Sequence, residues 1–142
     1  TQLENILKKF KLDLINFPFS VGNTKFLNNN LLSLIKKRKS EIHIRSVFMQ
    51  GLLLIKNKSR IPKKLKNTRF LENWHMFLKK NKIDPLEGCI QFIKLRKEFN
   101  VVIIGVDNLD QFKQIIKFFN EDKIIDYPKI LNKYKYSNIR KW

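Results

Sequence analysis

The spacing of hydrophobic residues along the chain predicts helices and strands that alternate. In five segments, apolar residues recur every three or four positions, as they do on one face of a helix. The predicted inner stripes are Leu3, Ile6, Leu7 and Phe10; Leu27, Leu31, Leu34 and Ile35; Leu71, Trp74, His75 and Leu78; Leu86, Cys89, Ile90 and Ile93; and Leu109, Phe112, Ile116 and Phe119. Short apolar runs bounded by turn residues predict strands over 12–19, 41–48 and 101–106.

Two of the predicted helices begin with capping residues. Asp84 suits the N-cap, Pro85 the first helical position and Glu87 the reciprocal capping bond. Asn108 and Gln111 have the spacing of a capping box before the last helix. These motifs fix where the two helices begin.

The order of elements indicates an α/β fold with a parallel sheet of about three strands, because each strand is separated from the next by helices. Residues 101–106 are almost all β-branched, which is typical of a strand buried on both faces. Three parallel strands leave two open edges and need helices to cover them. The elements therefore look like part of a larger α/β fold.

The net charge of +18 first suggests nucleic acid as a partner, but its composition argues against it. The cations are 24 Lys and only 6 Arg, and Lys, Asn and Ile together fill 57 of 142 positions, a general compositional bias. The basic clusters at 36–39 and 56–66 do not interleave with aromatic residues as a base-stacking surface would. We expect a solvated surface and no nucleic-acid partner; a basic nucleic-acid-binding or non-catalytic interaction module stays open as the alternative.

Several classes of site are excluded by what the sequence contains. Cys89 is the single cysteine and there are two histidines, so we expect no metal site and an inert, packed thiol. The four glycines form neither a GxGxxG loop nor a phosphate-binding loop of the GxxxxGK[ST] type. No apolar run reaches the roughly 20 residues of a membrane span, and the first residues are polar, so we expect a cytoplasmic protein without a membrane partner. The chain begins with Thr1, which suggests a processed product or a fragment.

Three segments at the ends of the predicted strands resemble the second half of an aldo/keto reductase barrel. Asn16-Phe17-Pro18-Phe19-Ser20 is similar to the family's sixth-strand pattern Gln-x-Pro-(Tyr/Phe)-Asn. The segment RSVFMQGLL at 45–53 resembles the seventh-strand variant Arg-Ser-x-Phe-x-Gln-Gly-Leu-Leu, and IGVDNLDQF at 104–112 resembles the eighth-strand turn. The order and spacing of these motifs, with the helix start at 84–87, carry the resemblance.

The resemblance implies that residues 1–120 are the C-terminal half of a (β/α)8 barrel holding strands six to eight, followed by a basic tail over 121–142 that we expect to be partly disordered. The intact protein would be an oxidoreductase that reduces a small carbonyl substrate by hydride transfer from NADP or NAD. The family's catalytic Asp, Tyr, Lys and His lie on earlier strands, and their motifs are absent from this chain. The chain alone would therefore be inactive without the N-terminal half of the barrel as its partner.

The resemblance also assigns cofactor-binding roles, each of which has a simpler alternative. Asn16 would hold the nicotinamide carboxamide, or it simply ends a strand. Arg45 would stack on the nicotinamide ring or reach the pyrophosphate, or it is a surface cation. The loop around the pyrophosphate would be shaped by Ser46, Phe48, Gln50 and Gly51, of which Phe48 could equally pack in the core.

The last predicted helix start would surround the adenine ribose through Gly105, Asn108 and Gln111; alternatively these residues form only a glycine turn and a capping box. Members of the family that prefer the phosphorylated dinucleotide usually place Lys or Arg here. This chain instead has Asp107 and Asp110, which would repel a 2′-phosphate. We therefore expect NAD to be accepted at least as well as NADP.

Overall fold

The computed structural model describes residues 2–26, 29–65 and 68–128. Thr1, Leu27 and residues 129–142 of the predicted tail lie outside the described residues. Within the described part, the sheet consists of β1 (Leu14–Pro18), β2 (Glu41–Arg45) and β3 (Val101–Val102), all parallel and in the order β1-β2-β3. Asn16 pairs with His43, which in turn pairs with Val101. The prediction of an α/β fold with three parallel strands is therefore confirmed.

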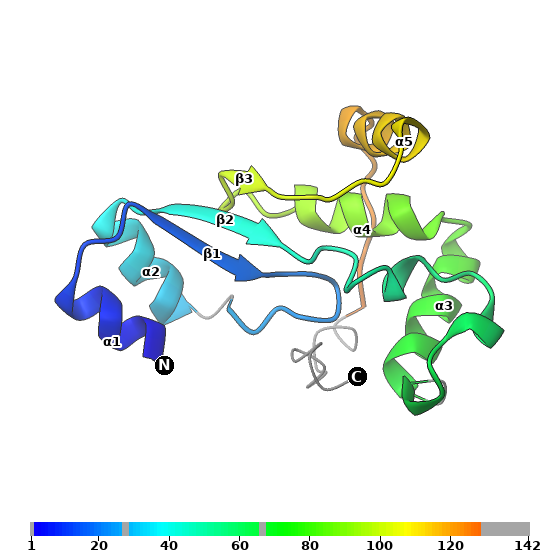
Figure 1. Cartoon of the computed structure of the whole chain (residues 1–142), viewed down its shortest axis with the longest axis horizontal. Coiled ribbons are helices and arrows are strands. Elements are labelled where there is room, and N and C mark those ends of the chain that lie inside the picture. The colour runs from blue at the N-terminus through cyan, green and yellow to red at the C-terminus, as the bar shows by residue number, and fades with distance from the viewer. Residues whose placement is uncertain (1, 27–28, 66–67, 129–142) are drawn as a thin grey trace.

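Helices connect the strands as the apolar spacing predicts. They are α1 (Gln2–Lys9), α2 (Asn29–Arg38), α3 (Arg69–Asn81), α4 (Pro85–Lys94) and α5 (Leu109–Asn120). Short 3-10 turns η1 (Leu52–Leu54), η2 (Lys58–Arg60) and η3 (Lys63–Leu65) occupy the long connection after β2. Figure 1 shows α1 and α2 at one end of the sheet, α3 at the other, and α5 over α4.

Side-chain caps start α4 and α5 where the motifs predict. An oxygen of Asp84 accepts a hydrogen bond from the N–H of Leu86 at 2.9 Å, and that of Asn108 accepts one from the N–H of Gln111 at 2.9 Å. The predicted reciprocal bond of Glu87 is not found among the described residues; one oxygen of this carboxylate accepts a hydrogen bond from the Lys123 ammonium at 2.9 Å. Each cap satisfies an N–H group that has no partner within the helix.

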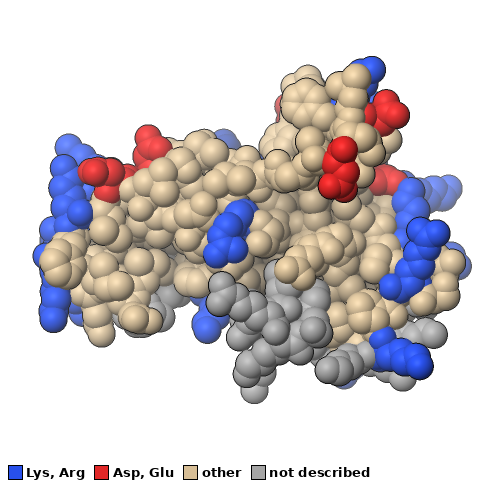
Figure 2. Space-filling view, in the orientation of Figure 1, with Lys and Arg blue, Asp and Glu red and all other residues tan. Residues whose placement is uncertain are grey.

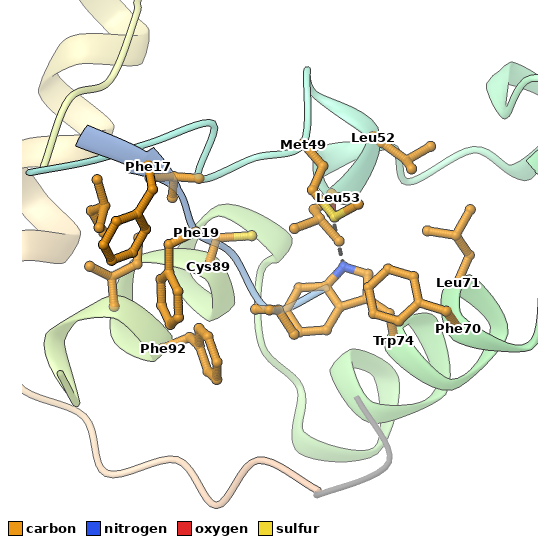
Figure 3. Packing of buried hydrophobic residues seen from close by; sticks show 14 of the residues in the cluster. Phe17, Phe19, Met49, Leu52, Leu53, Phe70, Leu71, Trp74, Cys89 and Phe92 are labelled. Atoms are coloured by element: carbon orange, nitrogen blue, oxygen red, sulfur yellow. Dashed lines mark hydrogen bonds between the residues drawn. The ribbon is translucent and has the colours of Figure 1, made fainter. Parts of the chain in front are cut away.

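The core lies between one face of the sheet and helices α2, α3 and α4. Ile15 and Phe17 of β1 are buried next to Ile42 and Ile44 of β2. Figure 3 shows Phe19, which follows β1, against Phe92 of α4, with ring centroids 5.7 Å apart. Trp74 of α3 is fully buried, and its indole N–H donates to the Leu53 carbonyl at 3.0 Å, which ties η1 to α3.

The other face of the sheet is largely open among the described residues. Strand residues alternate between the faces, so Leu14 and Asn16 of β1 and Glu41 and Arg45 of β2 are exposed, while His43 between them is half-buried. No described helix covers these side chains. In a closed barrel this face would look inward, toward strands that this sheet does not contain.

Two predicted patterns of burial are wrong. The run 101–106 was predicted to be a strand buried on both faces, but only Val101–Val102 pair with β2, and Val101 is 39% and Ile103 44% exposed. The stripe predicted to face inward on α5 is exposed at Leu109, Phe112 and Ile116, and its buried residue is Ile115. β3 is the edge strand of the described sheet, so no described strand covers its outer side, and α5 packs on α4 through residues other than Leu109, Phe112 and Ile116.

Residues 121–128, which the sequence assigns to the tail, pack on α4. The Tyr127 hydroxyl donates to the Gly88 carbonyl at 2.6 Å, and its ring contacts those of Phe77 and Phe92. Ile125 is buried as well. The packed body therefore extends beyond residue 120, at least to the last described residue.

Candidate functional site

A cleft of about 420 Å³ lies at the carboxyl ends of β2 and β3. The turn that follows β2, the start of α4 and the first turns of α5 enclose it. Five predicted site residues line this cleft, namely Phe48, Gln50, Gly51, Gly105 and Gln111. An adjoining hollow of about 230 Å³ adds Ser46 to the same group. The fold thus brings together residues from two motifs more than 50 positions apart, at the end of a parallel sheet where α/β proteins bind ligands.

The turn between β2 and η1 has an unusual backbone. Met49, Gln50 and Gly51 follow one another with φ angles of 50°, 54° and 81°, and Ser46 has a φ of 58°. A left-handed conformation costs a residue other than glycine about 1–2 kcal/mol. No described residue accepts a hydrogen bond from the N–H groups of Gln50 or Gly51. Gln50 and Gly51 both line the cleft, so their two N–H groups are candidate donors to a bound anion.

Charged groups at the cleft include a pair that the sequence motifs did not point to. Lys56 and Asp84 both line the cleft, and the Lys56 ammonium lies 2.7 Å from the Asp84 carboxylate. The sequence pattern predicts solvated surface for the basic segment that contains Lys56, and only a helix cap for Asp84. Asp107 adds a second carboxylate to the lining. The cleft thus has one described cation close to the Gln50–Gly51 turn.

The start of α5 forms the opposite wall. The side-chain oxygen of Gln111 accepts a hydrogen bond from the backbone N–H of Asp107 at 2.9 Å. The backbone N–H of Gln111 donates to the side-chain oxygen of Asn108. Asn108 itself is exposed and does not line the cleft. Its part in this site is to begin the helix that carries Gln111, Gln114 and Ile115 to the wall.

Asn16 and Arg45 lie apart from the cleft, on the open face of the sheet. Asn16 is exposed beside His43, whose ring nitrogen is 2.9 Å from the Glu41 carboxylate. Arg45 is exposed at the end of β2 and donates weakly to the Ser46 hydroxyl at 3.4 Å. The predicted nicotinamide contacts and the predicted phosphate contacts therefore occupy neighbouring but separate surfaces, joined at Ser46.

Other candidate groups have structural surroundings. Cys89 is buried on α4, and burial, with a smaller contribution from the Asp84 charge, raises the pKa of its thiol far above the usual value. The thiolate is therefore disfavoured, which makes the thiol unreactive. The His75 ring nitrogen is 2.9 Å from the Ile55 carbonyl. Among the described residues, no three His, Cys, Asp or Glu side chains are grouped so that they could hold a metal ion.

The visible face carries charges of both signs. Figure 2 shows Lys and Arg mainly toward its two ends, Asp and Glu around α5 and also at the end opposite α3, and no continuous basic stripe across this view. None of the described helices has the length and apolar composition needed to cross a membrane.

Comparison with known proteins identifies the fold. No protein-family model and no curated protein matches the sequence. Among solved structures, the chain is similar to the holo form of the aldo-keto reductase AKR11C1 from Bacillus halodurans, with a TM-score of 0.66 and 16% sequence identity. The chain has the fold of the C-terminal part of an aldo/keto reductase barrel. The resemblance seen in the sequence motifs is thus confirmed at the level of the fold.

The similarity covers most of this chain but less than half of the aldo/keto reductase. It includes 87% of this chain and 42% of the solved structure. This share agrees with three strands of an eight-stranded barrel. The open sheet face and the free β3 edge are the surfaces that such a partial barrel must leave uncovered.

Proposed function

We propose that the chain is the cofactor-binding part of an NAD(P)-dependent oxidoreductase of the aldo/keto reductase type. The observation that carries the proposal is the cleft itself. It joins an anion-suited left-handed turn after one strand to a helix N-terminus after the next, and both occur at the carboxyl end of the sheet. The fold supports the same class of protein.

The residues at the cleft fit the chemistry of a dinucleotide. The unpaired N–H groups of Gln50 and Gly51 and the Lys56 ammonium are donors for a pyrophosphate. Gly105 leaves open space, since a Cβ atom added there would have no neighbour within 4 Å. Gln111 offers a side-chain amide for ribose hydroxyls, and Asn16 and Arg45 would receive the nicotinamide end on the open face.

When bound, the dinucleotide supplies the hydride that reduces a small carbonyl substrate. The residues of this chain would bind and orient it: the turn at 49–51 fixes the phosphates, α5 fixes the adenosine end, and the open sheet face supports the ring that reacts. The catalytic acid would come from strands outside this sheet. NADP and NAD are both candidates, and we expect a cytoplasmic protein.

The partner implied by this function is the other part of the barrel. Exposed apolar side chains gather along the β3 edge and its continuation into α5, at Val101, Ile103, Val106, Leu109, Phe112 and Ile116. The opposite edge exposes Leu14 on β1 and Ile6 and Phe10 beside it. A parallel strand and a helix at each edge would cover these groups, as in a closed barrel.

Titration of the chain with ADP-ribose tests the proposal, since this probe carries the adenosine and pyrophosphate but no nicotinamide. We expect saturable binding by calorimetry, weakened about fivefold or more by Lys56→Met, which removes a charged donor to the phosphates. Lys113→Met is the matched control, because Lys113 is an exposed cation of α5 outside the cleft. Absence of saturable binding, or equal losses in the two variants, would overturn the assignment of the cleft.

A further inference from the structure

Helix α5 is attached to the rest of the molecule mainly by polar contacts at its carboxyl end. Of its twelve residues only Ile115 is buried; Phe118 and Phe119 are half-buried, and Leu109, Phe112 and Ile116 are exposed. A helix that buries so little apolar surface gains little orientation from packing. Contacts other than apolar packing must therefore hold α5 in place.

Gln91 of α4 provides the first polar attachment. It is 2% exposed, and its side-chain amide donates to the carbonyls of Phe118 at 2.9 Å and Glu121 at 2.6 Å. Its oxygen accepts a longer hydrogen bond from the Lys123 N–H at 3.4 Å. The amide nitrogen and the oxygen of the buried Gln91 side chain thus all bind backbone groups at the end of α5 and in the residues that follow it.

Lys94, one turn further along α4, provides the second polar attachment of α5. Its ammonium donates to the carbonyls of Phe119 at 2.7 Å and Glu121 at 2.8 Å, and it pairs with the Asp122 carboxylate at 2.7 Å. The last carbonyls of a helix have no partner within the helix and carry its negative end, so a cation there is favourable. The hydrogen bond and charge of Lys94 also lower the pKa of Asp122.

The opposite end of the same helix forms a wall of the cleft. Gln111, Gln114 and Ile115 line it, while the carbonyls held by Gln91 and Lys94 belong to the last turn. Gln111 and Phe118 are seven residues apart, or about 10 Å along the axis of a helix. Because a helix is rigid over this length, its orientation at one end sets the position of side chains at the other.

We infer that Gln91 and Lys94 form a clamp on the carboxyl end of α5 that positions the cleft wall, and are therefore positioning residues for nucleotide binding. The nucleotide part of this inference rests on the proposed function. The clamp itself rests only on the hydrogen bonds described above. Neither side chain lines the cleft, so any effect on binding must pass through α5.

Hydrogen exchange of the chain tests the clamp without any ligand. Lys94→Met removes the ammonium but keeps most of the apolar stem, and Gln91→Leu removes the amide at similar volume. We expect faster exchange over 109–120 in both, with the amides of α3 and the sheet unchanged. Lys94→Arg, which retains charged donors, should restore slow exchange, and Lys113→Met should behave like the unaltered chain. If exchange becomes faster throughout the chain, or does not become faster over 109–120, the clamp is overturned.

Binding of ADP-ribose tests the link between the clamp and the cleft. We expect Lys94→Met to weaken binding about fivefold or more and Lys94→Arg to stay within about twofold of the unaltered chain. Selectively faster exchange of α5 with unchanged affinity would overturn the positioning role. If the unaltered chain itself does not bind ADP-ribose, the proposed function and the nucleotide role fail together, and the exchange result alone decides whether the clamp holds α5. Lys94→Met keeps the test decisive if Gln91→Leu does not fold.

Discussion

The Lys56 ammonium lies 2.7 Å from one oxygen of Asp84, while the other oxygen of Asp84 accepts the N–H of Leu86 at 2.9 Å. One carboxylate therefore both starts α4 and holds a cation at the edge of the cleft. The ion pair is exposed at its Lys56 end, so its own contribution to stability is small. The cap and the pair can be separated by substitution.

Replacing Asp84 by Ala should destabilise the chain by about 1 kcal/mol, because the N–H of Leu86 loses its acceptor. Asp84→Asn should cost much less, since Asn caps helices nearly as well while it removes the charge that faces Lys56. Urea unfolding of the two variants measures the difference. Equal losses in both would mean that the ion pair, and not the cap, stabilises the start of α4.

Substitution by Ala should have different effects on stability at Gly22 and at Gly105. A Cβ atom at Gly22 would lie 2.6 Å from the Met49 sulfur and 2.7 Å from the Phe70 ring, whereas one at Gly105 would meet nothing within 4 Å. Gly22→Ala should therefore cost about 1–3 kcal/mol through overpacking. Gly105→Ala should leave stability unchanged or raise it by up to about 1 kcal/mol. Unfolding midpoints that fall equally would contradict the close packing of Met49 and Phe70 against Gly22.

The succession of helices and strands along the chain and the starts of α4 and α5 could be predicted, because they depend on local residues. Asp84 and Asn108 cap their helices through hydrogen bonds that span two or three positions. The burial of 101–106 and of the Leu109 stripe could not be predicted correctly. Apolar spacing indicates which side chains suit a covered position, but it does not show whether the covering element is present.

The site was predictable only in part for a similar reason. The motifs located the turn at Gly51 and the start of α5, which the fold joins in one cleft. The pairing of Lys56 with Asp84 depends on the path of the chain through η1 to α4, which no local spacing shows. The cofactor-binding roles of all these residues stay predictions, and strand alternation places Asn16 and Arg45 on the open face, apart from the cleft.

The carboxylate of Asp107 should determine which dinucleotide binds. It lines the cleft, and Asp110 follows it in the first turn of α5, so a 2′-phosphate near them would be repelled. We expect NAD to bind at least as tightly as NADP, and Asp107→Asn to tighten NADP binding about threefold while leaving NAD nearly unchanged. Calorimetric titration of both cofactors measures this, with Glu72→Gln on α3 as a charge-matched control. A tenfold preference of the unaltered chain for NADP would contradict it.

Stability should fall at alkaline pH because two acids on or against α4, the buried Cys89 and the half-buried Tyr127, resist ionisation. Burial is the main cause that raises the pKa of Cys89 above its usual 9.0 and that of Tyr127 above its usual 10.0; the charge of Asp84 adds to the first, and those of Cys89 and Glu87 add to the second. At pH 7 both groups are almost fully protonated whether the chain is folded or not, so they have almost no effect there.

Above those values the unfolded chain loses protons that the folded chain keeps. The free energy of unfolding should then decrease by up to about 1.4 kcal/mol per pH unit for each group. Urea unfolding between pH 8 and 11 measures the slope, and the slope should be shallower in Cys89→Ala and in Tyr127→Phe than in the unaltered chain. Tyr127→Phe should also lower stability at pH 7, since the Gly88 carbonyl loses its donor. An alkaline slope that neither substitution reduces would show that other groups, such as surface lysines, control the loss of stability.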